Sequence, residues 1–175
     1  MTGKVHAILG TSTAIAVALC VPDFDIMGNT ITPWIGVLGS TAGSYMPDID
    51  IAQSKLGQKH KWLSKHLTHR GITHTLLFPV LLVGVMLLLG FVPVLPSLIF
   101  GFTIGYLAHI FADLFNKKGV PILWPLSKAK LHVACVKTAS TAQQIIFIII
   151  WEVVLLCLVL SHWGVLQKAM ALLSG

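Results

Sequence analysis

Residues 96–115 read PSLIFGFTIGYLAHIFADLF, and this stretch decides the class of fold. It is almost wholly apolar and carries no charged side chain before Asp113. About 20 predominantly apolar residues span the hydrocarbon core of a bilayer as an α-helix. We therefore predict a membrane-spanning helix at Pro96–Phe115, with His109 and Asp113 close to its C-terminal end.

Four further apolar segments accompany this one: Val5–Val21, Thr32–Pro47, Thr75–Val92 and Gln144–Trp163. Charged residues make up 10% of the 175-residue chain, whereas a soluble domain carries about 25%. The sequence thus predicts an all-α polytopic membrane helix bundle with about five apolar helices, forming a single domain over residues 1–175. The first two segments are short, which leaves open whether they cross the bilayer completely.

Small residues recur at helical spacing in three of these segments, at Gly10, Ala14 and Ala18, at Gly39 and Gly43, and at Gly101 and Gly105. Stripes of small residues allow helix backbones to approach closely in lipid. We therefore expect these helices to lie inside the bundle. A cleaved signal peptide is the alternative for the first segment, but its apolar run starts almost at once and contains His6.

The basic residues are distributed unequally between the two sides that five crossings create. Of the 12 Lys and Arg residues, all except Lys168 fall beside the N-terminus or in the loops 48–74 and 116–143. The positive-inside rule places this side in the cytoplasm. The bilayer accounts for the net charge of +6, so a nucleic-acid partner is not expected. Nothing in the sequence specifies an oligomeric state.

Seven histidines and aspartates lie where four segments begin or end on this predicted cytoplasmic side. They are His6, Asp48, Asp50, His69, His74, His109 and Asp113. Ionisable side chains are costly in lipid unless they are paired or bind a ligand. Because four helix ends deliver them to one depth, we predict a site for one or more divalent metal ions. Mixed His and Asp ligands suit zinc, and manganese or iron is also compatible.

Local spacing supports this prediction. His109 and Asp113 are related by i, i+4 and project from one helix face. Asp48 and Asp50 follow Pro47, where we expect an irregular turn that aims both carboxylates at one centre. Between His69 and His74 we expect a bend at Gly71, with Thr73 as the N-cap of the third segment.

The same residues resemble the YdjM-type family of bacterial inner-membrane proteins, which are inferred to be metal-dependent hydrolases. The resemblance is carried by Pro47–Asp50, the His69–His74 block and His109–Asp113, and also by Leu56–Lys59, Trp62–Lys65 and Gly119–Pro125. It implies a multi-pass inner-membrane protein whose metal ligands are the seven residues above. Thr75 stands where the family often has Ser, and the last apolar segment carries no matching motif. A remoter likeness to helical zinc phospholipases C and single-strand nucleases suggests a phosphoester substrate.

If the protein is an enzyme, seven candidates exceed the three protein ligands usual for one catalytic zinc. Two or more ions would share a bridging carboxylate, for which we choose Asp48 or Asp50, and a remaining carboxylate would act as general base. Arg70 suits a phosphate. Lysines between Lys55 and Lys65 would attract an anionic headgroup. A lipid or lipid-linked phosphoester at the cytoplasmic face is the substrate that this chemistry favours.

Two other classes of function compete with a hydrolase. A metal or ion transporter would need polar residues that continue through the bilayer, and Glu152 in the last segment is the one charged residue placed for that. Glu152 is equally compatible with a protonated side chain bonded within its helix. A non-catalytic membrane protein that uses its basic loops for partners is the third class. The three cysteines do not indicate a disulfide framework.

Overall fold

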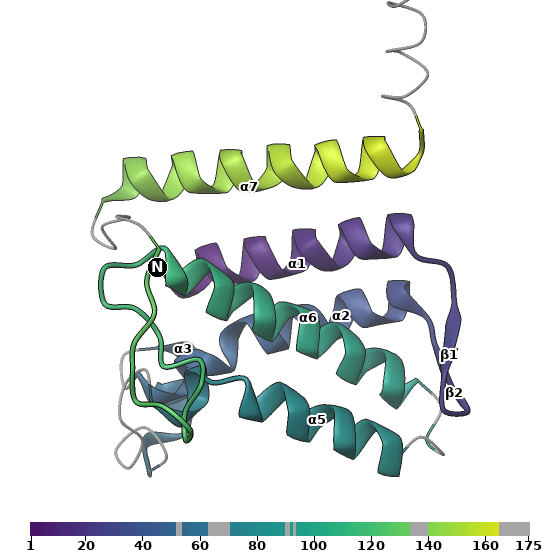
Figure 1. The fold of residues 1–175 in the computed structure, drawn as a ribbon, viewed down its shortest axis with the longest axis horizontal. Helices are drawn as coiled ribbons and strands as arrows, with labels where there is room; N and C mark the ends of the chain where they lie inside the picture. The colour runs from purple at the N-terminus through teal and green to yellow at the C-terminus, as the bar shows by residue number, and fades with distance from the viewer. Residues whose placement is uncertain (52–53, 63–70, 90–91, 93, 134–139, 165–175) are drawn as a thin grey trace, which may run out of the picture.

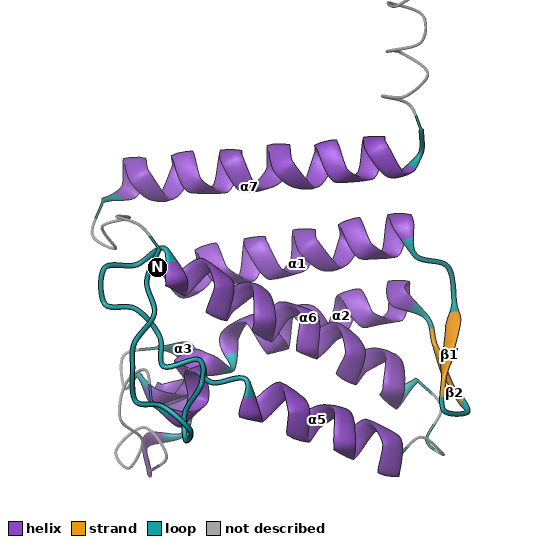
Figure 2. Ribbon diagram, in the orientation of Figure 1, coloured by secondary structure: helices purple, strands orange, loops and turns teal. Residues whose placement is uncertain are grey.

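The computed structural model describes residues 1–51, 54–62, 71–89, 92, 94–133 and 140–164. It is a bundle of helices with one small β-hairpin (Figures 1 and 2). The elements, in chain order, are α1 (Gly3–Cys20), β1 (Phe24–Ile26), β2 (Asn29–Ile31), α2 (Pro33–Tyr45), the 3₁₀ helix η1 (Pro47–Asp50), α3 (Lys55–Lys59), the 3₁₀ helix η2 (Ile72–His74), α5 (Leu77–Leu88), α6 (Leu95–Leu114) and α7 (Thr141–His162). The all-α membrane bundle predicted from the sequence is confirmed.

Three of the helices, α1, α6 and α7, are long and apolar enough to cross a membrane. Among the other described α-helices, α2 has 13 residues, α5 has 12 and α3 has five. The first predicted segment, which becomes α1, is thus a full-length helix, and the third is shorter than expected at both ends. Thr75 is extended, with φ −116° and ψ 160°, so that α5 begins only at Leu77, and the helix ends at Leu88 instead of Val92.

Helices α2 and α6 pack backbone against backbone. A Cβ atom built on Gly101 would stand 1.7 Å from the carbonyl oxygen of Gly36, and one on Gly43 would stand 2.0 Å from that of Phe102. Neither position accepts a side chain without separating the helices. The close approach predicted for the small-residue stripes is confirmed, and it fixes α2 and α6 as the centre of the bundle.

Helix α7 lies along the edge of the bundle beside α1 (Figure 1). The indole nitrogen of Trp151 donates a hydrogen bond of 3.1 Å to Thr13 Oγ1 of α1. Its ring also packs edge-on against Phe111 of α6, at a centroid distance of 5.6 Å. Most other side chains of α7 are exposed, as expected of a helix that turns an apolar surface to lipid.

The two ends of the bundle differ in structure and charge. At one end β1 and β2 pair antiparallel, with Phe24 opposite Ile31, and Asp23 and Asp25 accept hydrogen bonds from threonines. At the other end lie the N-terminus, η1, α3 and the loop that follows α6 (Figure 1). The described lysines belong to this second end, which we call the basic end. The hairpin was not predicted from the sequence.

Candidate metal centre

Six histidine and aspartate side chains from four elements meet inside the basic end. They are His6 of α1, Asp48 and Asp50 of η1, His74 of η2, and His109 and Asp113 of α6. Each is at most 6% exposed. The structure thus brings together six of the seven predicted ligands. The seventh, His69, and the predicted phosphate-binding Arg70 lie outside the described residues.

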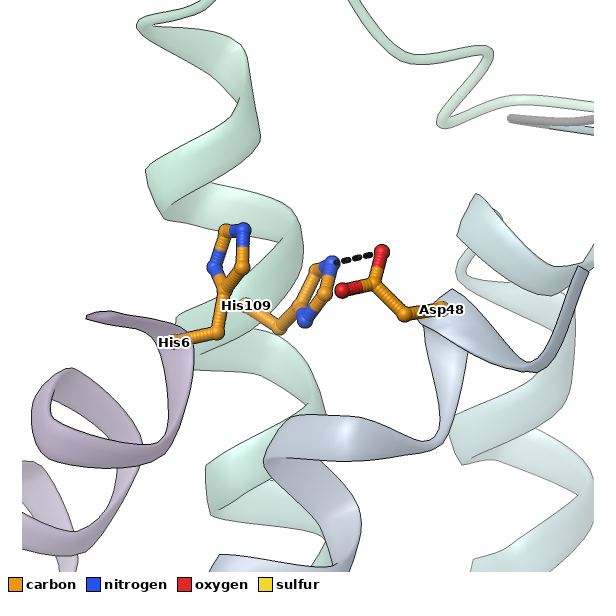
Figure 3. Close-up of side chains that lie close together, drawn as sticks. All are labelled: His6, Asp48 and His109. Carbon is orange, nitrogen blue, oxygen red and sulfur yellow. Dashed lines mark ion pairs between the residues drawn. The ribbon is translucent and has the colours of Figure 1, made fainter. Parts of the chain in front are cut away.

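One group within this cluster consists of His6, Asp48 and His109 (Figure 3). The two imidazole rings stack with their centroids 3.6 Å apart. His109 Nε2 lies 3.6 Å from Asp48 Oδ1. One nitrogen or oxygen from each of the three residues falls within 4.8 Å of the others, which is close enough for one ion to reach all three.

A second group consists of His74, His109 and Asp113, whose nitrogen and oxygen atoms also lie within 4.8 Å of one another. Asp113 faces two histidines with different oxygens. Its Oδ1 is 3.4 Å from His6 Nε2, and its Oδ2 is 3.7 Å from His74 Nε2. This carboxylate therefore lies between the two groups.

Hydrogen bonds fix the orientation of two imidazole rings. His109 Nδ1 lies 2.7 Å from the carbonyl oxygen of Ser44. A carbonyl only accepts, so Nδ1 carries the proton and the lone pair of Nε2 faces the cluster. His74 Nδ1 lies 3.5 Å from Asp50 Oδ2 and 3.1 Å from Thr73 Oγ1, which itself donates to Asp50. His74 Nε2 is thereby directed at Asp113. Such partners are typical of metal-binding histidines.

Other side chains that the sequence did not single out hold this cluster in place. Tyr106 of α6 donates a 2.5 Å hydrogen bond to the carbonyl oxygen of Thr73 and so ties η2 to α6. Asn116 donates a 2.8 Å hydrogen bond to Asp113 Oδ1, which also accepts from the Met1 amine at 3.2 Å. Tyr106 precedes His109 by three residues and Asp113 by seven, a helical spacing that could have identified it.

The expected N-cap at Thr73 is wrong. Helix α5 has Leu76 at its N-cap and no side-chain cap, because the 3₁₀ turn and extended Thr75 separate Thr73 from the helix. The irregular turn expected at Asp48 and Asp50 is confirmed as η1. The hydroxyl of Thr73 donates to Asp50 instead of capping a helix.

The cluster leaves polar atoms that a cation would satisfy. Among the described residues, no hydrogen bond reaches either ring nitrogen of His6 or Nε2 of His109, although these atoms are buried. Burial raises the pKa of Asp48 above its ordinary value, and the nearby His6 and His74 partly offset this increase. Buried imidazole lone pairs facing carboxylates are a donor set that fits a divalent metal ion.

A bundle with apolar spans and a buried His–Asp cluster at its basic end defines a polytopic membrane protein with a candidate metal centre. The chain belongs to the family described as YdjM inner membrane protein, whose model matches residues 1–173. The resemblance drawn from the motifs is therefore confirmed, and the family name places such proteins in an inner membrane.

Curated relatives agree with this assignment. The chain is 42% identical over 88 residues to the inner membrane protein YdjM of Escherichia coli K12, and equally to that of Shigella flexneri. Each match covers 46% of this chain and only 44% of the relative. The chain is also 29% identical to the uncharacterized protein YvsG of Bacillus subtilis 168, over 83% of this chain and 87% of that protein. No solved structure matches.

Proposed function

We propose that this protein is a membrane-bound, metal-dependent hydrolase that acts on a phosphoester at the cytoplasmic face. The proposal rests on the lack of hydrogen bonds from the described part of the chain to buried imidazole nitrogens of His6 and His109. Their nitrogens face Asp48 and Asp113 without a hydrogen bond from the described residues. A buried polar atom left without a partner costs about 1–3 kcal/mol. A bound cation would remove that cost.

The geometry suggests how the ligands divide between ions. Since Ser44 occupies Nδ1 of His109, only Nε2 is available, and His109 serves a single ion. We assign it to a first ion with His6 and Asp48, and assign His74 and Asp113 to a second. Asp113 faces His6 of the first group with one oxygen and His74 of the second group with the other. It therefore suits the bridging role better than Asp48 or Asp50, the two carboxylates predicted for that role from the sequence. Asp50 would orient His74. Zinc fits this donor set, as would manganese or iron.

A divalent ion bound here would polarise a phosphoryl oxygen and lower the pKa of a bound water. The chain itself would position the substrate and accept the proton. Asp50, the carboxylate that this division leaves outside both ions, is our candidate for the general base, and Asp48 would take that role only if it did not bind the first ion. Arg70 stays the predicted phosphate ligand. The exposed lysines of the basic end would attract an anionic substrate.

Transport is less well supported. A path for ions would have to run from the basic end to the hairpin through the centre of the bundle. There the backbones of α2 and α6 touch at Gly36 and Gly101, and a Cβ atom on Gly10 of α1 would stand 1.9 Å from Ser44 Oγ. These contacts argue against a water-filled route between the three helices.

The metal content of detergent-purified protein tests the proposal. We expect the wild type to retain zinc, manganese or iron in elemental analysis and to hydrolyse a phosphodiester or phosphomonoester. His109→Ala should lose the metal and at least about 100-fold of the activity. His132→Ala is the matched control, because this histidine is exposed and belongs to neither group of the cluster. Equal metal content in the wild type, His109→Ala and His132→Ala would refute the metal centre.

A further inference from the structure

Two apolar grooves open beside the candidate metal centre. The first, of about 570 Å³, crosses the outer surface of α6 and is lined chiefly by Leu76, Ile110, Phe111, Leu114, Ile122 and Trp151. Past Phe111 and Trp151 it adjoins a further apolar space of about 400 Å³ between α6 and α7. The second groove, of about 370 Å³, lies between α5 and the segment that follows α6. It is lined chiefly by Leu76, Val80, Ile122, Leu123, Trp124 and Leu126.

The two grooves meet at one ridge formed by Leu76 and Ile122, which line both. The backbone N–H of Leu76 donates a 3.1 Å hydrogen bond to the carbonyl oxygen of Ile122, so the ridge is a fixed element of the fold. It begins two residues after His74 of the candidate metal centre. In α6, Ile110 and Leu114 of the first groove directly follow His109 and Asp113. The grooves therefore converge at the depth of the cluster.

The surface of the basic end carries positive charge. Lys117, Lys118, Lys128 and Lys130 are exposed in the segment after α6. Antiparallel hydrogen bonds between Val120 and Leu131 hold the two ends of this segment together. Lys130 directly precedes Leu131, and Lys118 lies two residues before Val120. Of the six acidic residues of the chain, Asp48, Asp50 and Asp113 are buried, and none lies between Asp113 and Glu152. An anionic group is the complement of this surface.

We infer that the basic end binds an anionic phospholipid with two acyl chains, one in each groove, with its headgroup beside the lysines and at the depth of His74. The inference rests on the proposed function in one respect, since it makes this lipid the substrate class of that hydrolase. A peptide is a poor occupant, because it would need partners for its backbone polar groups. The one hydroxyl lining the first groove, that of Thr13, already accepts a hydrogen bond from Trp151.

Competition between lipids tests the binding directly. Metal-free, delipidated protein in detergent is mixed with equal amounts of dioleoyl phosphatidylglycerol, dioleoyl phosphatidylcholine and lyso-phosphatidylglycerol, and retained lipid is read by native mass spectrometry. We expect the anionic two-chain lipid to exceed each competitor by at least about fivefold, given the acyl area buried and the charge. Equal retention of all three lipids would mean a non-selective lipid annulus and would overturn the inference.

Two variants locate the binding. Ile122→Trp fills the ridge and should abolish the preference for phosphatidylglycerol, whereas Ile149→Trp on the exposed face of α7, outside both grooves, should preserve it. Leu126→Ser changes a side chain that is 92% exposed, so folding is not at risk, and it should lower the two-chain lipid to the level of the lyso-lipid. Wild-type preference in both Ile122→Trp and Leu126→Ser would overturn the inference.

The two proposals fail separately. Because lipid retention is measured on metal-stripped protein, it does not depend on the metal centre. Selective lipid binding, together with the absence of metal from the protein as first purified, would support the lipid site and refute the hydrolase. Metal binding and cleavage of a soluble phosphoester, without lipid preference, would support the hydrolase and refute the lipid site.

Discussion

Replacing Gly101 by alanine tests how the bundle positions the candidate metal centre. The new Cβ atom would stand 1.7 Å from the carbonyl oxygen of Gly36 and 2.5 Å from its Cα. The first distance is about half an ordinary van der Waals separation. Because the opposing atoms belong to a backbone, no rotamer change relieves the contact, and α2 and α6 must separate. We expect a destabilisation of about 3 kcal/mol, at the upper end of what overpacking costs.

The assay is thermal unfolding of detergent-purified protein, followed by circular dichroism, with metal content measured on the same samples. For a chain of this length, the expected cost corresponds to a fall in Tm of roughly 6–12 °C. Separation of α2 from α6 would also lengthen the 2.7 Å contact between Ser44 and His109, so we expect bound metal to fall. Gly84→Ala in α5 is the matched control, because nothing lies within 4 Å of its Cβ position. An unchanged Tm in Gly101→Ala, equal to that of Gly84→Ala, would refute the reasoning.

Two further substitutions test the groups that orient the histidines. Tyr106→Phe removes the hydroxyl that ties η2 to α6, and it should lower metal affinity by about tenfold while the helix content stays unchanged. A metal affinity equal to that of the wild type would contradict the role given to this hydrogen bond. Asp50→Asn keeps the shape of the side chain but removes the charge beside His74, and should lower affinity by about 10–100-fold in a competitive chelator titration. A loss no larger than that of Asp25→Asn, an exposed aspartate of the hairpin, would show that Asp50 does not act on the site.

The helices were predictable because the bilayer imposes a strong constraint on sequence. A span must be apolar and of a given length, so α6 and α7 lie almost where the apolar runs placed them. The boundaries of α5 were not predictable to the same degree, because the break at Thr75 depends on η2, which tertiary contacts to Asp50 and Tyr106 hold.

The hairpin illustrates a weak local signal. Its turn residues Met27 and Gly28 have φ angles of 49° and 82°. A two-residue hairpin turn with both angles positive is usually marked by Asn-Gly or Asp-Gly. Methionine rarely adopts this conformation, so no strong local signal marks the strands on either side.

The position of the cluster was predictable, but its internal arrangement was not. Order along the chain alone placed His6, Asp48 and His109 at one depth, and the structure brings them together. The carbonyl oxygen of Ser44 that orients His109 belongs to the backbone and has no signature in the sequence. The choice of a carboxylate to bridge two metal ions also depends on three-dimensional positions. The two Asp113 oxygens face different histidines, and the sequence does not show this.

The cluster joins residues that are far apart in the chain, and this separation has a consequence for membrane insertion. His6 is synthesised about 100 residues before His109 and Asp113, so α1 enters the bilayer while its partners are still absent. Its imidazole lies in the first two turns of α1, near the helix end, where interfacial water can solvate it. The pocket therefore closes only after α6 has been inserted, and α7, which contributes no side chain to the cluster, is added to a site that is already complete.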